Sequence, residues 1–325
     1  MRVQVGILYS RIRRDEKLLL NELRECGHEV VKVDVRKQQF GLSDPPEEMK
    51  GVDVLVDRCL ATSRSLYATE FAEAYDIPVV NAAETAEVCA NKVKNSLALE
   101  RAGVPTPATD VAFTKDAALE SIEAFGYPCV LKPVIGSWGR LMAKIDSRSA
   151  AEAILEHKET LGHYEHKVFY IQEFVDKPGR DIRVVAVDGE PVAGMVRSSD
   201  HWLTNAAKGA DTAEIEITDE IRDLVETASD AVGGGLLGID LMETGVESEA
   251  DHREASTGTG SEATRDPSEP RDDGGGLSGY TVHEVNHTVE FKALDEVTDI
   301  DVPATVVDWL ETTAAAADEK AEATT

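Results

Sequence analysis

Three side chains in the last third of the chain are of the types that bind magnesium. Asp240 lies in the stretch GIDLME, and Glu284 and Asn286 lie in HEVNHT. Carboxylate and amide oxygens are hard ligands that suit Mg²⁺. Glu284 and Asn286 are two residues apart, so on a strand both side chains point to one face. Asp240 lies on the neighbouring strand if the intervening residues form a hairpin excursion. A solvated strand face with chance acids is the alternative, but an asparagine is out of character there.

A lysine followed by a glycine-containing loop predicts a phosphate site in the stretch VLKPVIGSWGR, residues 130–140. The ammonium group meets the phosphate charge, and glycines let backbone N–H groups approach the oxygens. The stretch is not a Walker loop, because GxxxxGK[ST] is absent. An ordinary structural turn explains this stretch equally well when it is taken alone. The candidate residues are Lys132, Gly136, Ser137, Gly139 and Arg140.

A third group of candidates lies in IQEFVDKPGRDIRVVAV, which starts at Ile171. Asp181 and Arg183 share a strand face, and Arg183 together with Arg197 offers planar forks for a carboxylate or an acyl phosphate. Surface arginines in salt bridges are the simpler explanation if this stretch is taken alone. The strand end before them could present backbone groups to a flat base. It consists of Glu173, Phe174 and Val175.

The elements that must position these residues begin with alternating strands and helices. Strands are expected at 3–10, 28–35, 52–58 and 78–83, with helices at 16–27 and 68–76 between them. This alternation predicts a parallel sheet with helices on its faces. We assign residues 1–85 to this first α/β domain.

Two further domains are expected, at 86–170 and at 171–312. The first opens with a single helix over 85–103, and the second contains a hairpin turn at Asp188-Gly189 and a helix capped by Thr218. Residues 246–279 are rich in Ser, Thr, Gly, Glu and Asp, which predicts a disordered acidic insertion in a hairpin turn. Residues 313–325 are expected to form a frayed helix or a flexible tail.

Composition excludes several classes of protein. The net charge of the 325-residue chain is −29, from 62 acidic and 33 basic residues, so non-specific nucleic-acid binding is not expected. No apolar run approaches the roughly 20 residues that span a membrane, and the N-terminus has no signal-peptide pattern, so we expect a cytoplasmic protein. Four widely spaced cysteines indicate free thiols. Acidity spread over the whole chain is typical of adaptation to high salt, where the Debye length falls to about 3 Å at 1 M.

Taken together, the segments resemble the ATP-grasp ligases, in the same order and over nearly the whole chain. NKVKNSLALERAGVPTP resembles the helix that opens their central domain, with Lys92 as the first phosphate-contacting lysine. VLKPVIGSWGR resembles the second lysine and the glycine loop, QEFV the adenine hinge, and GIDLME with EVN the metal set. The resemblance implies an α/β fold in which an N-terminal parallel-sheet (pre-ATP-grasp) lobe precedes two α+β lobes that clasp ATP.

Within that superfamily the chain resembles the RimK-like branch, and more narrowly the LysX/ArgX ligases of carrier-dependent lysine and arginine biosynthesis. PVIGSWGR, HWLTNAAKGA and EVNHTVEFK carry this narrower resemblance. The acidic insertion after Thr244 departs from the family pattern. Together with the composition, the resemblance leads us to expect a protein from a halophilic archaeon.

The resemblance implies a reaction in which a carboxylate takes the γ-phosphate of ATP and an amine then displaces phosphate. The carboxylate belongs to the C-terminal glutamate of a small acidic carrier protein, LysW, and the amine to glutamate or 2-aminoadipate. Lys92 and Lys132 hold the phosphates, Arg183 or Arg197 stabilises the acyl phosphate, and the metal set holds two Mg²⁺ ions, or Mn²⁺. Asn205, His287 and Thr288 line the amino-acid pocket. A homodimer or homotetramer is expected.

Two rival functions remain open at this point. A RimK-like ligase could extend another protein or a small-molecule cofactor, although the segment after EVN argues against it. A nucleotide-binding regulator without catalysis would be expected to lose its metal ligands, yet Asp240, Glu284 and Asn286 are all present.

Overall fold

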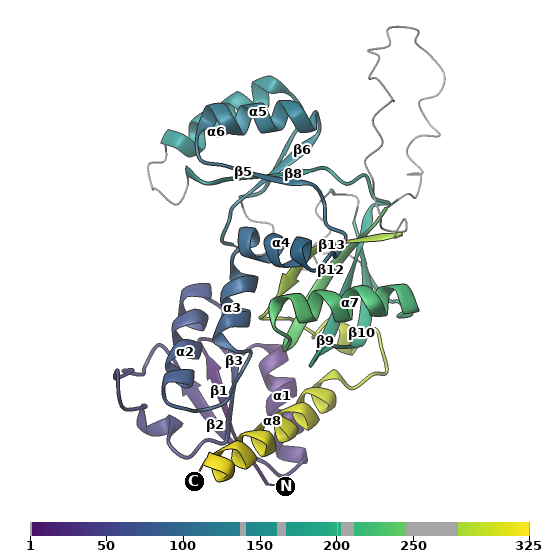
Figure 1. The fold of residues 1–325 in the computed structure, drawn as a ribbon. Coiled ribbons are helices and arrows are strands. Elements are labelled where there is room, and N and C mark those ends of the chain that lie inside the picture. The colour runs from purple at the N-terminus through teal and green to yellow at the C-terminus, as the bar shows by residue number, and fades with distance from the viewer. Residues whose placement is uncertain are drawn as a thin grey trace, which may run out of the picture.

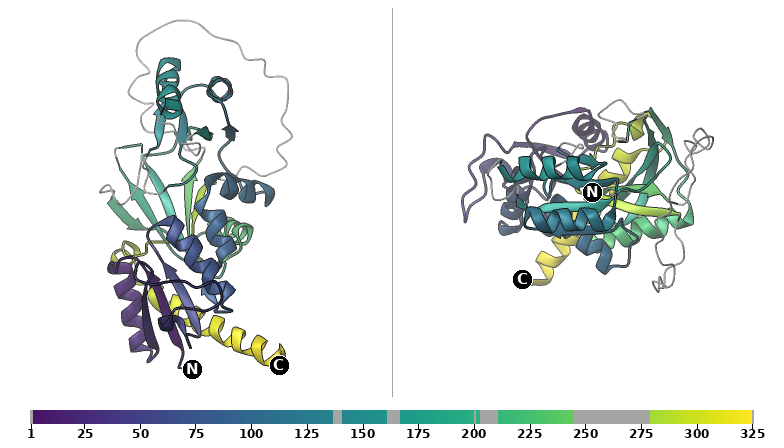
Figure 2. Two further views of the ribbon diagram at one scale, coloured as in Figure 1. Left: turned by 90° about the vertical axis from the view of Figure 1, so that its left-hand side faces the viewer. Right: turned by 90° about the horizontal axis from the view of Figure 1, so that it is seen from above.

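The computed structural model describes residues 2–136, 141–160, 167–199, 201–202, 211–244 and 279–324. Three lobes, each built on its own sheet, lie along the long direction of the molecule, and the lobe that is third in the sequence lies between the other two (Figures 1 and 2). The fold is mixed α/β, as the sequence predicts. The expected acidic insertion lies, except for Gly279, outside the described residues.

The N-terminal lobe is a parallel sheet of order β2-β1-β3-β4, which confirms the arrangement expected from alternating strands and helices. Its strands are β1 (Gln4–Tyr9), β2 (Glu29–Asp34), β3 (Val54–Arg58) and β4 (Val79–Val80). Its helices are α1 (Arg14–Glu25), the 3₁₀ turn η1 (Glu47–Met49) and α2 (Thr62–Ala74). Val5, Ile7, Val54 and Val56 are buried in its core. Continuous apolar runs of this kind are typical of strands covered on both faces.

The middle lobe is a four-stranded antiparallel sheet of order β5-β8-β6-β7, and α5 and α6 lie side by side on one of its faces (Figure 2). Its strands are β5 (Thr109–Ala112), β6 (Cys129–Lys132), β7 (Ala143–Ile145) and β8 (Phe169–Glu173), and its helices are α5 (Lys115–Phe125) and α6 (Arg148–Thr160). Leu131 and Ile171 pack in the core under the helices. Strand alternation therefore sends Lys132 and Gln172 to the opposite face.

The third lobe is a five-stranded sheet of order β11-β10-β9-β12-β13. Its strands are β9 (Arg180–Val187), β10 (Glu190–Ser198), β11 (Asp211–Glu214), β12 (Leu236–Glu243) and β13 (Tyr280–Asn286), and α7 (Asp219–Val232) covers one face. The hairpin turn between β9 and β10 is confirmed, since Asp188 and Gly189 have φ of 52° and 87°. The Thr218 cap is also confirmed, because its Oγ1 accepts from the Ile221 N–H at 3.3 Å.

The single helix expected over 85–103 is wrong, because two helices meet at Asn91. These are α3 (Ala83–Ala90) and α4 (Lys92–Arg101). Asn91 is extended, with φ −116° and ψ 111°, and its side-chain oxygen accepts from the Val93 and Lys94 amides. Asn91 also forms a β-bridge with Ile135. The break places Lys92 in the first turn of α4, beside the loop after β6.

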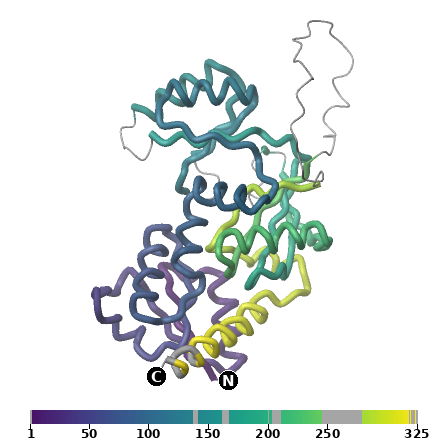
Figure 3. The backbone as a smooth tube through the Cα atoms, viewed as in Figure 1, coloured from purple at the N-terminus to yellow at the C-terminus, as the bar shows by residue number. Residues whose placement is uncertain are grey.

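The C-terminal helix α8 (Val302–Thr324) runs through the segment expected to be a frayed helix or tail and lies against α1. Ala314, inside that segment, is buried. The first and last described residues consequently lie at the same end of the molecule (Figure 3). Leu310 of α8, Val54 of β3 and Val187 of β9 belong to one apolar core, so the N-terminal and third lobes are packed together. A short 3₁₀ turn, η5 (Leu294–Glu296), precedes α8.

Within the described ranges, no helix combines the length and the apolar character needed to cross a bilayer.

Asn81 joins the N-terminal lobe to the third lobe through three hydrogen bonds. Its Nδ2 donates to the carbonyl oxygens of Leu236 at 2.9 Å and His287 at 2.7 Å, and its Oδ1 accepts from the Leu236 N–H at 2.6 Å. Only 4% of Asn81 is exposed. Gly235 is required beside it, because a Cβ there would lie 2.2 Å from the Asn81 oxygen.

We expect Asn81→Ala to lower the free energy of unfolding by about 3 kcal/mol, because it leaves buried backbone groups of two lobes without partners. Urea unfolding followed by circular dichroism measures the change. Asn21→Ala removes an amide from the exposed side of α1 and serves as the control. Equal effects of the two substitutions would contradict the role of Asn81 between the lobes.

Candidate active site

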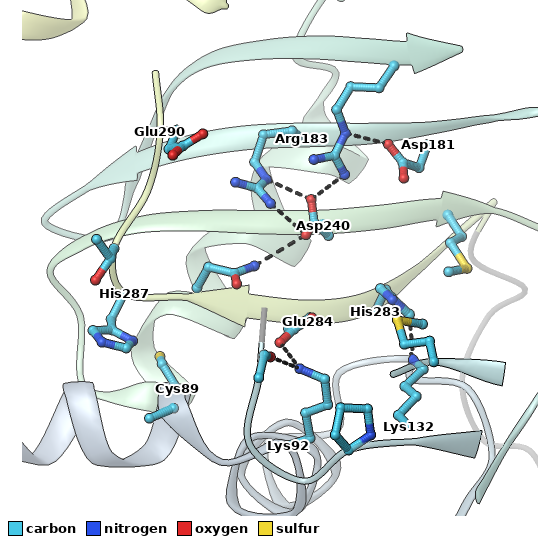
Figure 4. A pocket seen from close by; sticks show the side chains of 18 of the residues that line it. Cys89, Lys92, Lys132, Asp181, Arg183, Asp240, His283, Glu284, His287 and Glu290 are labelled. Carbon is cyan, nitrogen blue, oxygen red and sulfur yellow. Dashed lines mark hydrogen bonds and ion pairs between the residues drawn. The ribbon is translucent and has the colours of Figure 1, made fainter. Parts of the chain in front are cut away.

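A cavity of about 440 Å³ is lined by all three lobes and by the segment after β13. Cys59 comes from the N-terminal lobe, Lys132 from the middle lobe and Asp240 from the third lobe. Figure 4 shows that side chains from the sheet of the third lobe and the side chains of Lys92 and Lys132 converge on this cavity. A volume of this size is within the usual range for small-molecule sites.

The three metal-ligand candidates are brought together on neighbouring strands. Asp240 on β12 lies directly opposite Glu284 on the antiparallel β13, which confirms the expected strand pairing. The Asn286 Nδ2 donates to Asp240 Oδ2 at 3.2 Å. No group of three or more His, Cys, Asp or Glu side chains in the described part of the chain is arranged to hold a metal ion.

Asp240 is the most heavily bonded carboxylate of the site. Arg183 donates to both of its oxygens, at 2.6 and 2.7 Å, and the Arg197 Nη2 donates to one of them at 2.6 Å. The Arg197 Nε also binds Asp181 at 2.6 Å. Burial favours the neutral acid, but the two guanidinium groups outweigh it and hold the pKa of Asp240 well below its usual range. The carboxylate is therefore charged at every physiological pH.

The donor set fits Mg²⁺ on chemical grounds. Asp240 stays ionised, Glu284 is a second carboxylate, and the side-chain oxygen of Asn286 accepts no hydrogen bond from any described residue, so it remains available as a ligand. In this structure the Lys92 Nζ forms an ion pair with Oε1 of Glu284 at 2.5 Å.

The two lysines predicted to hold phosphates reach this cavity from different elements. The Lys92 Nζ donates to the Gly136 carbonyl at 3.0 Å as well as to Glu284. The Lys132 Nζ donates to Gln172 and lies 3.3 Å from Nδ1 of His283. Lys132 is 2% exposed, and burial lowers the pKa of its ammonium to about 7.

His283 is a cavity residue that strand alternation does not predict. Asp240 pairs with Glu284, but the next residue, Leu241, pairs with Val282, so His283 is the extra residue of a β-bulge. The bulge lets His283 and Glu284 both face the cavity although they are adjacent in sequence. Burial lowers the pKa of His283 well below its usual value, which makes the ring a neutral partner for Lys132.

One end of the cavity has the apolar walls that a flat base requires. The predicted residues Glu173, Phe174 and Val175 line it. The Glu173 side chain accepts from the Ala108 N–H at 2.8 Å, and the Lys144 ammonium lies 4.3 Å from the centre of the Phe174 ring. The cavity lining also includes Met142 and Met242, which the sequence patterns did not predict, and Met195, which packs in the apolar core with Val289 and Phe291. Unbranched thioethers adapt to a flat ligand, but methionine is equally common in cores, so no sequence signal marks them.

The opposite end of the cavity is built where the N-terminal lobe meets the segment after β13. The predicted residues His287 and Thr288 line it together with Leu60, Thr62 and Lys292. Arg13, which the sequence analysis also missed, lies here and binds Glu290. Its role depends on contact between residues 277 positions apart, for which no local pattern exists.

Four predicted site residues cannot be placed. Ser137, Gly139, Arg140 and Asn205 lie outside the described residues.

Two lobes that close on a cavity with two lysines and an Asp-Glu-Asn set define the ATP-grasp class of enzymes. The fold agrees: a RimK-domain ATP-grasp protein of Sphaerobacter thermophilus superposes with a TM-score of 0.72 at 24% identity, covering 94% of this chain and 98% of that one. Residues 5–88 match the LysX preATP-grasp domain and residues 89–252 the RimK-like ATP-grasp domain.

Relatives of known activity narrow the class. The alpha-aminoadipate–LysW ligase LysX of Saccharolobus solfataricus is 36% identical over 71% of this chain and 84% of its own length. The glutamate–LysW ligase ArgX of Sulfolobus acidocaldarius is 27% identical over 95% of this chain and 98% of its own. The chain belongs to the RimK-like ATP-grasp family and is similar to LysX and ArgX ligases. It is an ATP-dependent carboxylate–amine ligase, and ligases of this family use ATP and Mg²⁺.

We expect ATP binding at pH 8 to take up nearly one proton, because Lys132 is mostly neutral in the free protein and phosphate anions favour its charged form. Below pH 7 the ammonium already carries its proton, so the uptake disappears as the pH falls through that value. Isothermal titration calorimetry in buffers of different ionisation enthalpy measures it.

Lys132→Met abolishes the proton uptake, whereas Lys115→Met, whose lysine pairs with Glu156 away from the cavity, retains it. Uptake that persists in Lys132→Met would show that another group binds the proton.

Proposed function

We propose that this enzyme joins the α-amino group of glutamate, of 2-aminoadipate or of both to the side-chain carboxylate of the C-terminal glutamate of a small acidic carrier protein of the LysW type. The reaction belongs to arginine or lysine biosynthesis in the cytoplasm. One observation carries the proposal: the chain matches a glutamate–LysW ligase over 95% of its own length and 98% of that relative. Such coverage extends over nearly the full length of both proteins.

The nucleotide occupies the cavity from the end lined by Glu173, Phe174 and Val175 to the two lysines. Lys92 and Lys132 contact its phosphates, and Asp240, Glu284 and Asn286 hold two Mg²⁺ ions, a role that Mn²⁺ also fills. Bound metal supplies charge neutralisation between the phosphate groups, which is the main requirement of phosphoryl transfer. The free oxygen of Asn286 and the ionised Asp240 support this assignment.

In the first step, a carboxylate oxygen of the carrier attacks the γ-phosphorus of ATP. The bond between that phosphorus and the bridging oxygen breaks, and ADP leaves with the electron pair. In the second step, the amine nitrogen attacks the acyl carbon, the bond from carbon to the phosphate oxygen breaks, and inorganic phosphate leaves with the pair. The amine loses its surplus protons to solvent, and an amide remains.

Arg183 and Arg197 stabilise the acyl phosphate. Each uses Nε and Nη2 for carboxylates of the protein, while its Nη1 forms no hydrogen bond or ion pair with any described residue. Gly238 makes room for one of these groups, because a Cβ there would lie 2.8 Å from the Arg183 Nη1. A rigid guanidinium with one free edge suits an anion that forms during the reaction.

The amine substrate binds at the end of the cavity lined by His287 and Thr288, with Asn205 as a third contact. This end borders the metal-ligand strand, since His287 directly follows Asn286. The amine is thereby held next to the carbon that it attacks.

The test measures phosphate release from ATP and Mg²⁺ with purified carrier and each amino acid in turn. The assay contains high salt, because the net charge of −29 predicts adaptation to it. We expect release that depends on both carrier and amino acid, and mass spectrometry of the carrier shows one added residue. Turnover with glutamate alone places the enzyme in arginine synthesis, and turnover with 2-aminoadipate adds or substitutes lysine synthesis.

Two controls make the assay specific. A carrier without its C-terminal glutamate supports no turnover, and Glu284→Gln lowers the rate at least a hundredfold because a metal ligand is weakened. If no amino acid supports turnover with intact carrier, the carrier assignment is wrong. The enzyme then acts on another protein or on a small-molecule cofactor.

A further inference from the structure

Three side chains from two lobes form a hydrogen-bonded series. The series ends at the cavity wall, at the end proposed to bind the amine. The Ser65 hydroxyl on α2 donates to Oδ2 of Asp57 on β3, and Nε2 of His287 lies 3.2 Å from the Ser65 Oγ. Oδ1 of Asp57 accepts from the Cys59 N–H at 2.9 Å. Asp57 is 5% exposed and Ser65 is fully buried. Only His287 of the three lines the cavity.

The donor and acceptor roles along this hydrogen-bonded series determine which nitrogen of His287 carries the hydrogen. A carboxylate only accepts, so the single hydrogen of the Ser65 hydroxyl is committed to Asp57. The Ser65 oxygen can then act toward His287 only as an acceptor, and Nε2 of the ring must be the N–H donor. The neutral ring therefore keeps its lone pair on Nδ1. No described residue forms a hydrogen bond to that nitrogen.

The ring is also held at its backbone. The His287 carbonyl accepts from the Asn81 amide at 2.7 Å, so the N-terminal lobe positions both the main chain and the side chain of this residue. Figure 4 shows His287 and Lys132 on opposite sides of Glu284. An acceptor nitrogen is thereby fixed at the end of the cavity away from the Lys132 phosphate site.

We propose that Nδ1 of His287 accepts a hydrogen bond from the amino group of the incoming amino acid, and that Asp57 and Ser65 are positioning residues that hold the ring in the accepting form. The inference rests on the proposed function, in which the amine binds at this end of the cavity. It adds a specific contact for the nucleophile and assigns a role to two buried residues that do not line the cavity.

Thr69, on the same helix as Ser65, has a hydroxyl group with a purely structural role. It is fully buried, one turn after Ser65, and its Oγ1 donates to the backbone carbonyls of Ser65 and Leu66. Neither Ser65 nor Leu66 lines the cavity. Thr69→Ala is therefore the matched control for Ser65→Ala.

The kinetic experiment compares two acceptors of the same acyl phosphate, the amino acid and hydroxylamine, with wild type, Ser65→Ala, Asp57→Asn and Thr69→Ala. Hydroxylamine traps the activated carrier as a hydroxamate and has no amino-acid contacts to lose. In Ser65→Ala we expect the KM for the amino acid to rise about tenfold and the ratio of amide to hydroxamate to fall by a similar factor. Thr69→Ala leaves both quantities within about twofold of wild type.

Asp57→Asn preserves the size of the side chain but reverses the direction of the hydrogen bonds in the series. The asparagine amide donates to Ser65, the Ser65 hydroxyl then donates to Nε2 of His287, and Nδ1 becomes an N–H group that faces the amine. We expect a larger loss than in Ser65→Ala, and Ser65→Thr, which restores a hydroxyl, recovers most of the amide-to-hydroxamate ratio. Equal losses in Ser65→Ala and Thr69→Ala, or a parallel fall of amide and hydroxamate formation, would overturn the proposal.

A second measurement does not depend on the reaction. Two-dimensional ¹H–¹⁵N spectra of histidine-labelled protein, assigned with His287→Gln, report the tautomer of His287. We expect the Nε2–H form in wild type and the Nδ1–H form in Asp57→Asn. An Nδ1–H form in wild type overturns the inference whatever the substrate. If the tautomers are as expected but wild type forms no hydroxamate with the carrier, then the proposed function fails instead.

Discussion

The site depends on one buried charge cluster, in which two arginines share a carboxylate. Arg183 lies directly opposite Asp240 across β9 and β12, and Arg197 lies opposite Asp181 across β10 and β9. A buried charge without a partner is strongly destabilising, so a shift of any of these strands by one residue would break several charged hydrogen bonds together. On the other face of the same strands, Ile182, Val184 and Ile239 pack against α7. Apolar packing and ion pairing therefore specify the same register of β9, β10 and β12, and the pairing of β12 with β13 places Glu284 beside Asp240.

The cavity does not share the strongly acidic character of the chain as a whole. The protein carries a net charge of −29, yet seven basic side chains line the cavity against six acidic ones. The basic residues are Arg13, Lys92, Lys132, Lys177, Arg183, Arg197 and Lys292, and the acidic residues are Glu173, Asp181, Asp240, Glu284, Glu290 and Glu296. Burial is the main cause of the lowered pKa of Lys132, and the nearby Lys92 ammonium acts in the same direction. Local charge, rather than net charge, thus determines what this acidic protein binds.

Sequence patterns predicted the parts of this arrangement that depend on neighbours along the chain. Alternation along β13 placed Glu284 and Asn286 on one face, and the positive φ angles of Asp188 and Gly189 follow from ordinary hairpin chemistry. The features that the sequence patterns did not predict depend on contacts between residues that are distant in the sequence. Asn91 interrupts a helical pattern because it pairs with Ile135, and a bulge against β12 turns His283 into the cavity.

The three lobes are not joined in the same way, and this affects how the site is assembled. The N-terminal and third lobes share one apolar core and the Asn81 hydrogen bonds. The core of the middle lobe contains only its own residues, from Ala112 to Ile171. Polar contacts at the cavity link that lobe to the rest, including Lys132 with His283 and the Gly136 carbonyl with Lys92. The end of the cavity lined by His287 and Thr288 therefore lies on two lobes that share an apolar core, whereas the end that contains Lys132 lies at a polar boundary between lobes.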